Sequence, residues 1–75
     1  MCIEETIGTN IRHRRKELHF AQEDFAYEIG LSPYYYGRIE RGKANPTIQV
    51  LTTIANGLGV KISELIDEGY GNSAY

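Results

Sequence analysis

The chain has 75 residues, and 41% of them are hydrophobic. That apolar share excludes intrinsic disorder as the default, because disordered chains bury too little apolar surface to offset the entropy of ordering. One small domain fits this length, since domains begin at about 50 residues. A separate sensing or catalytic domain does not fit, so we expect no small-molecule effector. The single cysteine excludes an intramolecular disulfide and a cysteine metal cluster.

The sequence carries no membrane or export signal. No apolar run approaches the roughly 18 residues of a membrane-spanning helix. The first residues are acidic, whereas a secretory signal begins with basic residues followed by an apolar run. We therefore expect a soluble, cytoplasmic protein.

The net charge of −2 conceals a segregation of charge along the chain. Seven of the eight Lys and Arg residues lie between Arg12 and Lys43, which gives that segment a net charge of +2 and the remainder −4. Binding to nucleic-acid phosphates depends on Lys and Arg, so this segment is the candidate contact region. A scattered, solvated surface is the alternative.

The apolar residues of the first segment recur at helical spacing. They predict a helix over about 6–18, preceded by an N-terminal extension, residues 1–5. Arg15 interrupts the apolar stripe that contains Ile11. A guanidinium on a packing face is costly to bury without a carboxylate, and Glu40 is the candidate partner in a structural ion pair.

Two short helices follow, over about 22–29 and 33–41. Gly30 ends the first, while Ser32 and Pro33 are typical of the N-cap and the first position of the second. The link between them is only three residues long. So short a link requires a sharp corner, which is the helix-turn-helix arrangement.

Two more helices complete the predicted fold. Thr47 as N-cap and Gly59 as terminator delimit the fourth, whose inward residues begin with Ile48. Apolar residues at 62–66 predict a short fifth helix. No alternating run favours a sheet, so we predict an all-α, compact five-helix bundle. The folded domain is expected to span residues 6–68, followed by a flexible tail, residues 69–75.

The predicted third helix has two different faces at roughly 100° per residue. Its packing side carries Tyr36, Ile39 and Glu40. Its opposite, aromatic and basic side carries Tyr34, Arg38 and Arg41. The DNA major groove admits a helix and offers guanine O6 and N7 to Arg and the thymine methyl to an aromatic edge. We predict base contacts from Pro33, Tyr34 and Arg38. An ordinary surface or a protein-contact patch is the alternative reading of the tyrosines.

Contacts to the DNA backbone would position such a helix without reading sequence. The candidates for these contacts are Gln22, Tyr35, Arg41, Lys43 and Asn45. Gln22 stands at a helix N-terminus, where free N–H groups attract anions. Gly37 lowers helix stability by about 1 kcal/mol relative to Ala, which indicates close packing against the second helix or against a phosphate. We expect Arg12 and Arg14 to add only long-range attraction.

Several short motifs occur in a fixed order and at characteristic spacings along the chain. They are Gln22-Glu23-Asp24-Phe25-Ala26, Gly30-Leu31-Ser32, Tyr36-Gly37-Arg38-Ile39-Glu40-Arg41-Gly42, Leu51-x-x-Ile54-Ala55 and Leu58-Gly59-Val60. Over about residues 7–67 the chain resembles the Xre, or Cro/repressor, family of helix-turn-helix DNA-binding proteins. Restriction-modification controller proteins and small phage repressors are the most similar in kind. The resemblance implies a lambda-repressor-like domain.

The family resemblance also implies a mode of action and specific residue roles. A homodimer would bind a near-palindromic operator on double-stranded DNA, with the third helix touching bases. Gln22 matches a phosphate-contacting glutamine, and Arg15 and Glu40 match an inter-helix ion pair. The chain departs from the pattern at Ala21, which replaces a Ser or Thr cap, and at Tyr36, which replaces a smaller aliphatic residue.

A dimer is also expected on energetic grounds. One recognition helix reads about three or four base pairs, and each mismatch costs only about 1–3 kcal/mol, which discriminates poorly against a genome. The candidate interface is formed by Val50, Ile62, Ile66 and Tyr70. Because no sensor domain is expected, occupancy would follow the protein's own concentration, which favours autoregulation. Glu23 on the second helix leaves open a contact with RNA polymerase.

Other functions find less support. A protein-interaction module, such as the antidote of a toxin pair, is the alternative from a different class. An enzyme is disfavoured, and we expect no cofactor and no metal. His13 and His19 lie six residues apart, too far for ligation from adjacent helical turns. Ser32 and Ser63 are typical of helix starts, and no motif supplies either with a histidine base.

Overall fold

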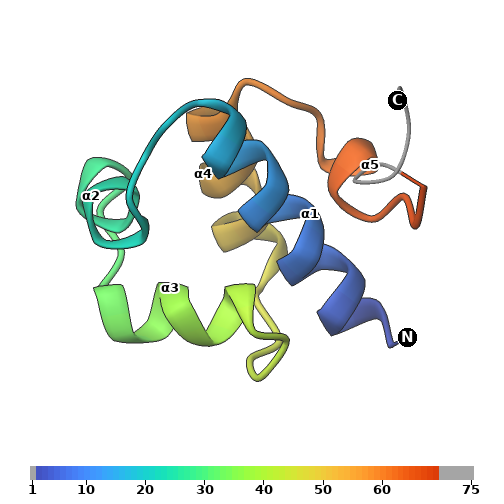
Figure 1. Cartoon of the computed structure of the whole chain (residues 1–75). Helices are drawn as coiled ribbons and strands as arrows, with labels where there is room; N and C mark the ends of the chain where they lie inside the picture. The colour runs from blue at the N-terminus through green and yellow to red at the C-terminus, as the bar shows by residue number, and fades with distance from the viewer. Residues whose placement is uncertain (1, 70–75) are drawn as a thin grey trace.

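The computed structural model describes residues 2–69, which form a five-helix arrangement without strands (Figure 1). The helices are α1 (Ile3–Glu17), α2 (Gln22–Glu28), α3 (Pro33–Glu40), α4 (Ile48–Leu58) and α5 (Ile62–Leu65). The predicted all-α class is confirmed. α1 runs through the middle of the molecule and contacts α3, α4 and α5, while α2 packs against α3. Within the described residues, none of these helices has the length and apolar character needed to span a membrane.

Local signals set most of the helix boundaries. Ser32 and Thr47 each accept a hydrogen bond from the backbone N–H three residues further on, at 3.1 Å. Such caps satisfy N–H groups that have no partner within the helix. Pro33 occupies the first turn of α3. Gly59 ends α4 in the left-handed conformation, with a φ of 71°. These boundaries agree with the sequence prediction.

The start of α1 differs from the prediction. The helix begins at Ile3, earlier than the expected start at residue 6, so part of the proposed N-terminal extension is helical. Glu5 accepts a hydrogen bond from the Cys2 backbone N–H at 3.2 Å. Glu4 and Glu5 also place negative charge in the first turn, where the helix dipole favours it. Apolar periodicity missed this turn because polar and charge-related interactions stabilise it.

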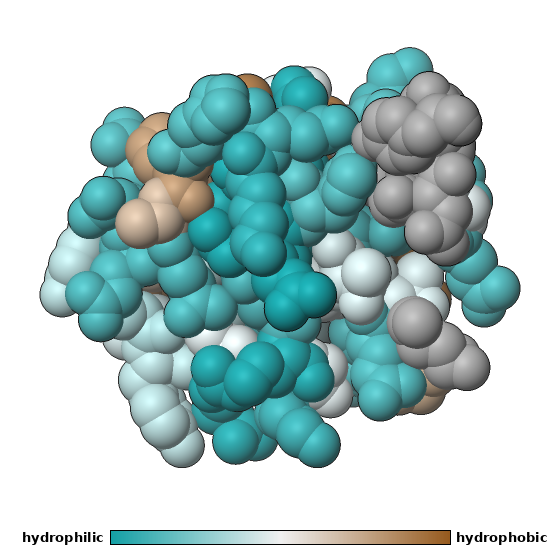
Figure 2. All heavy atoms as spheres, in the orientation of Figure 1, coloured by the Kyte–Doolittle hydropathy of each residue, from teal (hydrophilic) through white to brown (hydrophobic). Residues whose placement is uncertain are grey.

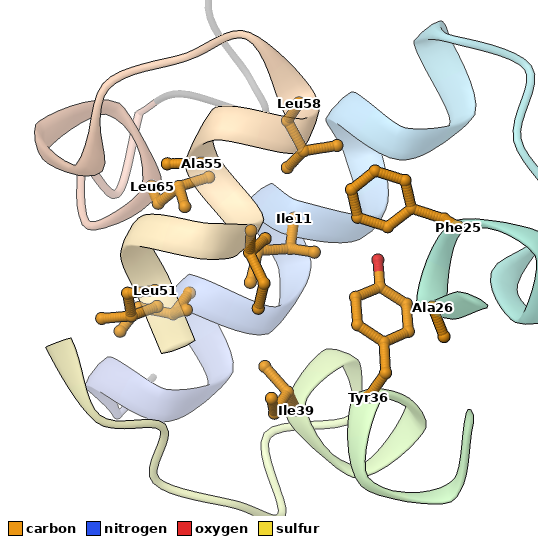
Figure 3. Packing of buried hydrophobic residues seen from close by; sticks show 11 residues of the cluster. Ile11, Phe25, Ala26, Tyr36, Ile39, Leu51, Ala55, Leu58 and Leu65 are labelled. Carbon is orange, nitrogen blue, oxygen red and sulfur yellow. The ribbon is translucent and has the colours of Figure 1, made fainter. Parts of the chain in front are cut away.

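All five helices contribute to one hydrophobic core. Its buried apolar residues are Ile7, Ile11, Phe25, Ala26, Tyr36, Ile39, Leu51, Ile54, Ala55, Leu58 and Leu65. Figure 3 shows Tyr36 reaching from α3 towards Phe25 of α2. The two ring centroids lie 5.5 Å apart in a tilted arrangement, a favoured geometry for aromatic pairs. The large Tyr36 is thus accommodated in the core and helps to fix α3 against α2.

The absence of a side chain at Gly8 lets α1 lie directly on the C-terminal end of α3. A Cβ atom at Gly8 would lie 2.5 Å from the carbonyl oxygens of both Ile39 and Glu40. Those oxygens belong to the backbone and cannot move aside as a flexible side chain can. Close approach at this point determines how α3 is presented on the outside of the molecule.

Candidate nucleic-acid interface

A buried ion pair holds α3 in place from beneath. Arg15 and Glu40 are each 7% exposed. Arg15 Nε donates to Glu40 Oε2 at 2.7 Å, and Nη2 donates to Oε1 at 3.1 Å. Arg15 Nη1 also donates to the Phe20 carbonyl at 2.7 Å. The pairing that the helical stripe predicted therefore joins α1, α3 and the loop before α2.

The environment of this pair keeps both of its members charged. Burial would raise the pKa of Glu40, but hydrogen bonds from Arg15 and Gln22 outweigh burial and lower the pKa. The hydrogen bond to Glu40 raises the pKa of Arg15 above its usual value. Burial also raises the pKa of the neighbouring Tyr36 hydroxyl, which stays protonated. The fixed negative charge of Glu40 is thus compensated within the fold.

Gln22 links the start of α2 to the same network. Its Nε2 donates to Glu40 Oε1 at 3.0 Å. Next to it, a Cβ atom at Gly37 would lie 3.5 Å from Gln22 Oε1 and 3.1 Å from Arg41 Nη1. The absent side chain therefore leaves room for two polar side chains, one of them from α2. The close approach of these two side chains accounts for a glycine inside α3.

The predicted base-contacting residues all belong to α3, which lies along the lower edge of the molecule in Figure 1. Tyr34 is 74% exposed. Pro33 and Arg38 are half-buried, and Tyr35 packs partly against the core. Arg38 Nη2 donates to the Lys43 carbonyl, which holds the guanidinium near the loop after α3. The other N–H groups of this guanidinium stay available to a ligand.

The predicted backbone-contacting residues beyond α3 are exposed. Arg41, Lys43 and Asn45 all lie at the surface. Figure 2 shows hydrophilic side chains over the C-terminal half of α3 and the following loop. Because Arg15 compensates Glu40, the cations Arg38, Arg41 and Lys43 give this part of the surface a positive charge. An aromatic N-terminal end and a basic C-terminal end thus share one outer face of α3.

The residues expected to form a dimer interface differ in exposure. Val50 and Ile62 are half-buried and pack against the core, whereas Ile66 is 45% exposed. Tyr70 lies outside the described residues. The expectation that Ile48 points inward was wrong, because this side chain is 69% exposed. Ile48 is the first residue of α4, one turn before the buried stripe, so periodicity alone did not place it.

Sequence reasoning also missed two contacts of α1 that fix the other end of the molecule. Arg14 Nε donates to the Leu58 carbonyl at 3.0 Å, at the end of α4. Asn10 Nδ2 donates to the Leu65 and Asp67 carbonyls at 2.8 Å, at the end of α5. Arg14 was expected to act only at long range. Helix ends expose carbonyls without partners, but the sequence does not show which side chain reaches them.

Two short helices joined by a tight turn, with the second exposed on a basic surface, define a helix-turn-helix DNA-binding domain. The chain belongs to the helix-turn-helix family, because the model of that family matches residues 11–65. It is a regulator of this type and not an enzyme.

Relatives and a solved structure agree with this assignment. The control protein C.MunI of Mycoplasma sp is 40% identical over 62 residues, which cover 81% of this chain and 84% of the relative. The HTH-type transcriptional regulator y4dJ of Sinorhizobium fredii is 35% identical over 66 residues, covering 88% and 86%. The crystal structure of the restriction-modification controller protein C.AhdI from Aeromonas hydrophila superposes with a TM-score of 0.78 at 29% identity, covering 83% of this chain and 90% of that one.

Proposed function

We propose that this regulator binds a near-palindromic operator as a homodimer, with α3 of each copy in the major groove. The observation that carries the proposal is the outer face of α3, where the exposed Tyr34 and the half-buried Arg38 belong to a helix that is held by a buried, hydrogen-bonded ion pair. A helix that is held from beneath and open on its outer side suits insertion into a groove.

Within this proposal, the roles of the α3 residues follow from their exposure. Pro33 and Tyr34 meet bases at the N-terminal end of α3, and Tyr34 offers an aromatic edge to a thymine methyl. Arg38 reads guanine, using the N–H groups that the Lys43 carbonyl does not occupy. Reading a base therefore requires no loss of the contact that positions Arg38.

The remaining polar groups bind the DNA backbone. Gln22 has a second amide hydrogen beyond the one donated to Glu40, and it lies at the start of α2. The other backbone contacts are proposed for Tyr35, Arg41, Lys43 and Asn45. Together these groups flank α3 on both sides, which fixes the orientation of the helix in the groove.

The dimer interface is proposed on the surface of α4 and α5. Ile66 is the exposed member of the candidate set, and Val50 and Ile62 lie half-buried beside the core. Tyr70 completes the proposal from outside the described residues. A two-fold dimer places two copies of α3 about one helical turn of DNA apart.

The proposal extends to regulation in the cell. A cytoplasmic dimer of this kind would respond to its own concentration, so it would control its own gene. Glu23 and Asp24 are exposed on α2, and they are the candidates for a contact with RNA polymerase. A nuclease-protection assay on the DNA upstream of the gene tests autoregulation, and an unprotected upstream region would contradict it.

Selection of bound sequences from random duplex DNA tests the operator proposal. We expect the recovered sites to share two inverted half-sites, and binding to fall steeply with salt. The double variant Gln22→Ala with Arg38→Ala should abolish the selected binding. Recovery of no common sequence, or of a single unpaired half-site, would contradict the proposal.

A further inference from the structure

An open groove lies between α1 and the C-terminal end of α3, with a volume of about 550 Å³. It is lined by Glu5, Thr9, Arg12, Glu40, Arg41 and Lys43. In Figure 1 the N-terminal half of α1 runs close to the loop that follows α3. Residues from distant parts of the sequence therefore face the same space.

The charge of this groove is positive despite its two carboxylates. Arg15 binds Glu40 at 2.7 Å and compensates its charge. The Glu5 carboxylate accepts a hydrogen bond from the Cys2 backbone N–H. Among residues 2–69, no carboxylate forms an ion pair with the three cations of the lining. Arg12, Arg41 and Lys43 are thus left to attract an anion from solution.

The groove is continuous with the α3 surface described above. The Lys43 carbonyl accepts from the Arg38 guanidinium, so one wall of the groove is joined to a proposed base-reading residue. The same wall is packed on α1, because a Cβ atom at Gly42 would lie 2.9 Å from Glu5 Cγ. The groove therefore opens beside the surface on which the proposed function places DNA.

We propose that the groove binds a phosphate of the DNA backbone, with Arg12 donating from α1 and Arg41 and Lys43 from the opposite wall. Guanidinium groups suit this role because their N–H groups bind phosphate oxygens in a fork. The proposal rests on the proposed function and extends it: α1 becomes an element that contacts DNA, and Arg12 acts by contact rather than by long-range attraction. The contact carries no sequence information.

Salt dependence of DNA binding separates contact from long-range attraction. Each phosphate contact contributes about 0.9 to the slope of log K against log salt. We expect Arg12→Ala to lower the slope by about that amount for each copy bound. The substitution should also weaken binding to operator DNA and to unrelated duplex DNA by the same factor. Lys16→Ala is the matched control, because Lys16 is an exposed cation on the same helix that does not line the groove. It should leave the slope unchanged.

Equal slope changes in the two variants would overturn the proposal, since they would show attraction by charge alone. An unchanged slope in Arg12→Ala would overturn it while leaving the proposed function intact. Wild-type protein that binds no DNA would overturn both. Thermal unfolding checks that each variant folds, and Arg12→Gln replaces Arg12→Ala if the latter does not.

A free anion has the same chemistry as a backbone phosphate, so a second measurement distinguishes the two sources. Inorganic phosphate is titrated at constant ionic strength while the backbone amides of residues 9–12 are followed by NMR. We expect only weak binding, with no saturation at millimolar phosphate. Saturation below roughly 1 mM phosphate, together with an unchanged salt slope of DNA binding in Arg12→Ala, would assign the groove to a free anion and overturn the proposal.

Discussion

The support of the recognition surface depends on a few individual side chains. Arg15 and Glu40 carry opposite charges in the interior, where an unpaired charge is strongly unfavourable. Gln22 and the Phe20 carbonyl complete their hydrogen bonds. Because α1 and α2, which pack against α3, both take part, loss of one member should affect both folding and the position of α3.

We predict that Glu40→Gln lowers the free energy of unfolding by about 3 kcal/mol, because it leaves the buried Arg15 charge without its counter-charge. Urea denaturation at pH 7 measures this loss. The exposed Glu68→Gln is the control and should change stability by less than about 0.5 kcal/mol. Similar losses in the two variants would contradict a stabilising role for the buried pair.

The same pair predicts a pH dependence. The folded state lowers the pKa of Glu40, so the carboxylate contributes stability above its unfolded pKa of about 4.3. That contribution is lost as the pH falls through the folded pKa. Wild-type protein should therefore lose stability in acid more steeply than Glu40→Gln. Parallel acid profiles for the two proteins would contradict this assignment.

Individual elements show which parts of the structure could be predicted. The N-caps of α3 and α4 and the glycine that ends α4 follow from local chemistry, which is why their boundaries agree with the sequence. The ion pair was also predictable, because Arg15 interrupts an apolar stripe. The start of α1, the exposure of Ile48 and the contact of Arg38 with the Lys43 carbonyl were not. They depend on polar caps, on the position of a helix end and on how a loop closes.

Substitution by Ala should have opposite effects on stability at two glycines that lie in packed helices. Gly8→Ala should destabilise the fold by about 1–3 kcal/mol, since the new Cβ meets backbone oxygens that cannot move freely. In Gly37→Ala the new Cβ meets the flexible end of the Arg41 side chain. The higher helix propensity of Ala stabilises α3 by about 1 kcal/mol, so the stability of the protein should be kept or increased. Thermal unfolding of both variants measures the difference. A strong loss of stability in Gly37→Ala would contradict this account.

Gly37→Ala should nevertheless weaken DNA binding. The new methyl group would lie 3.1 Å from Arg41 Nη1 and so displace the Arg41 side chain, which is proposed to bind phosphate. The loss of one charge-assisted hydrogen bond, about 1.5 kcal/mol, corresponds to roughly tenfold lower affinity. Fluorescence anisotropy with labelled operator DNA measures the change. Unaltered affinity would show that Arg41 does not contribute in its present position.

The whole molecule is organised around α1, whose side chains bind α3 on one side and the ends of α4 and α5 on the other. The proposed dimer surface and the proposed DNA surface are therefore both positioned by one central helix. Such an arrangement would keep the two copies of α3 at a defined distance, as a palindromic site requires.

We predict that Ile66→Glu dissociates the dimer with little effect on the fold, because this side chain is 45% exposed. Analytical ultracentrifugation should show a wild-type species of twice the 8.5 kDa chain mass and a variant at the chain mass. Tyr27→Glu on α2 is the control, since Tyr27 is 68% exposed and outside the candidate interface. A wild-type protein that stays at 8.5 kDa with and without operator DNA would contradict the dimer.

The base preference of Arg38→Ala, measured on a complete set of single-base operator variants, tests insertion of α3 into the major groove most directly. If Arg38 reads a guanine, the variant loses about 1–3 kcal/mol of discrimination at one base pair in each half-site and keeps the wild-type preferences elsewhere. Uniform weakening across all sequences would show that Arg38 binds only the backbone. That result would contradict the central claim that the outer face of α3 reads DNA sequence.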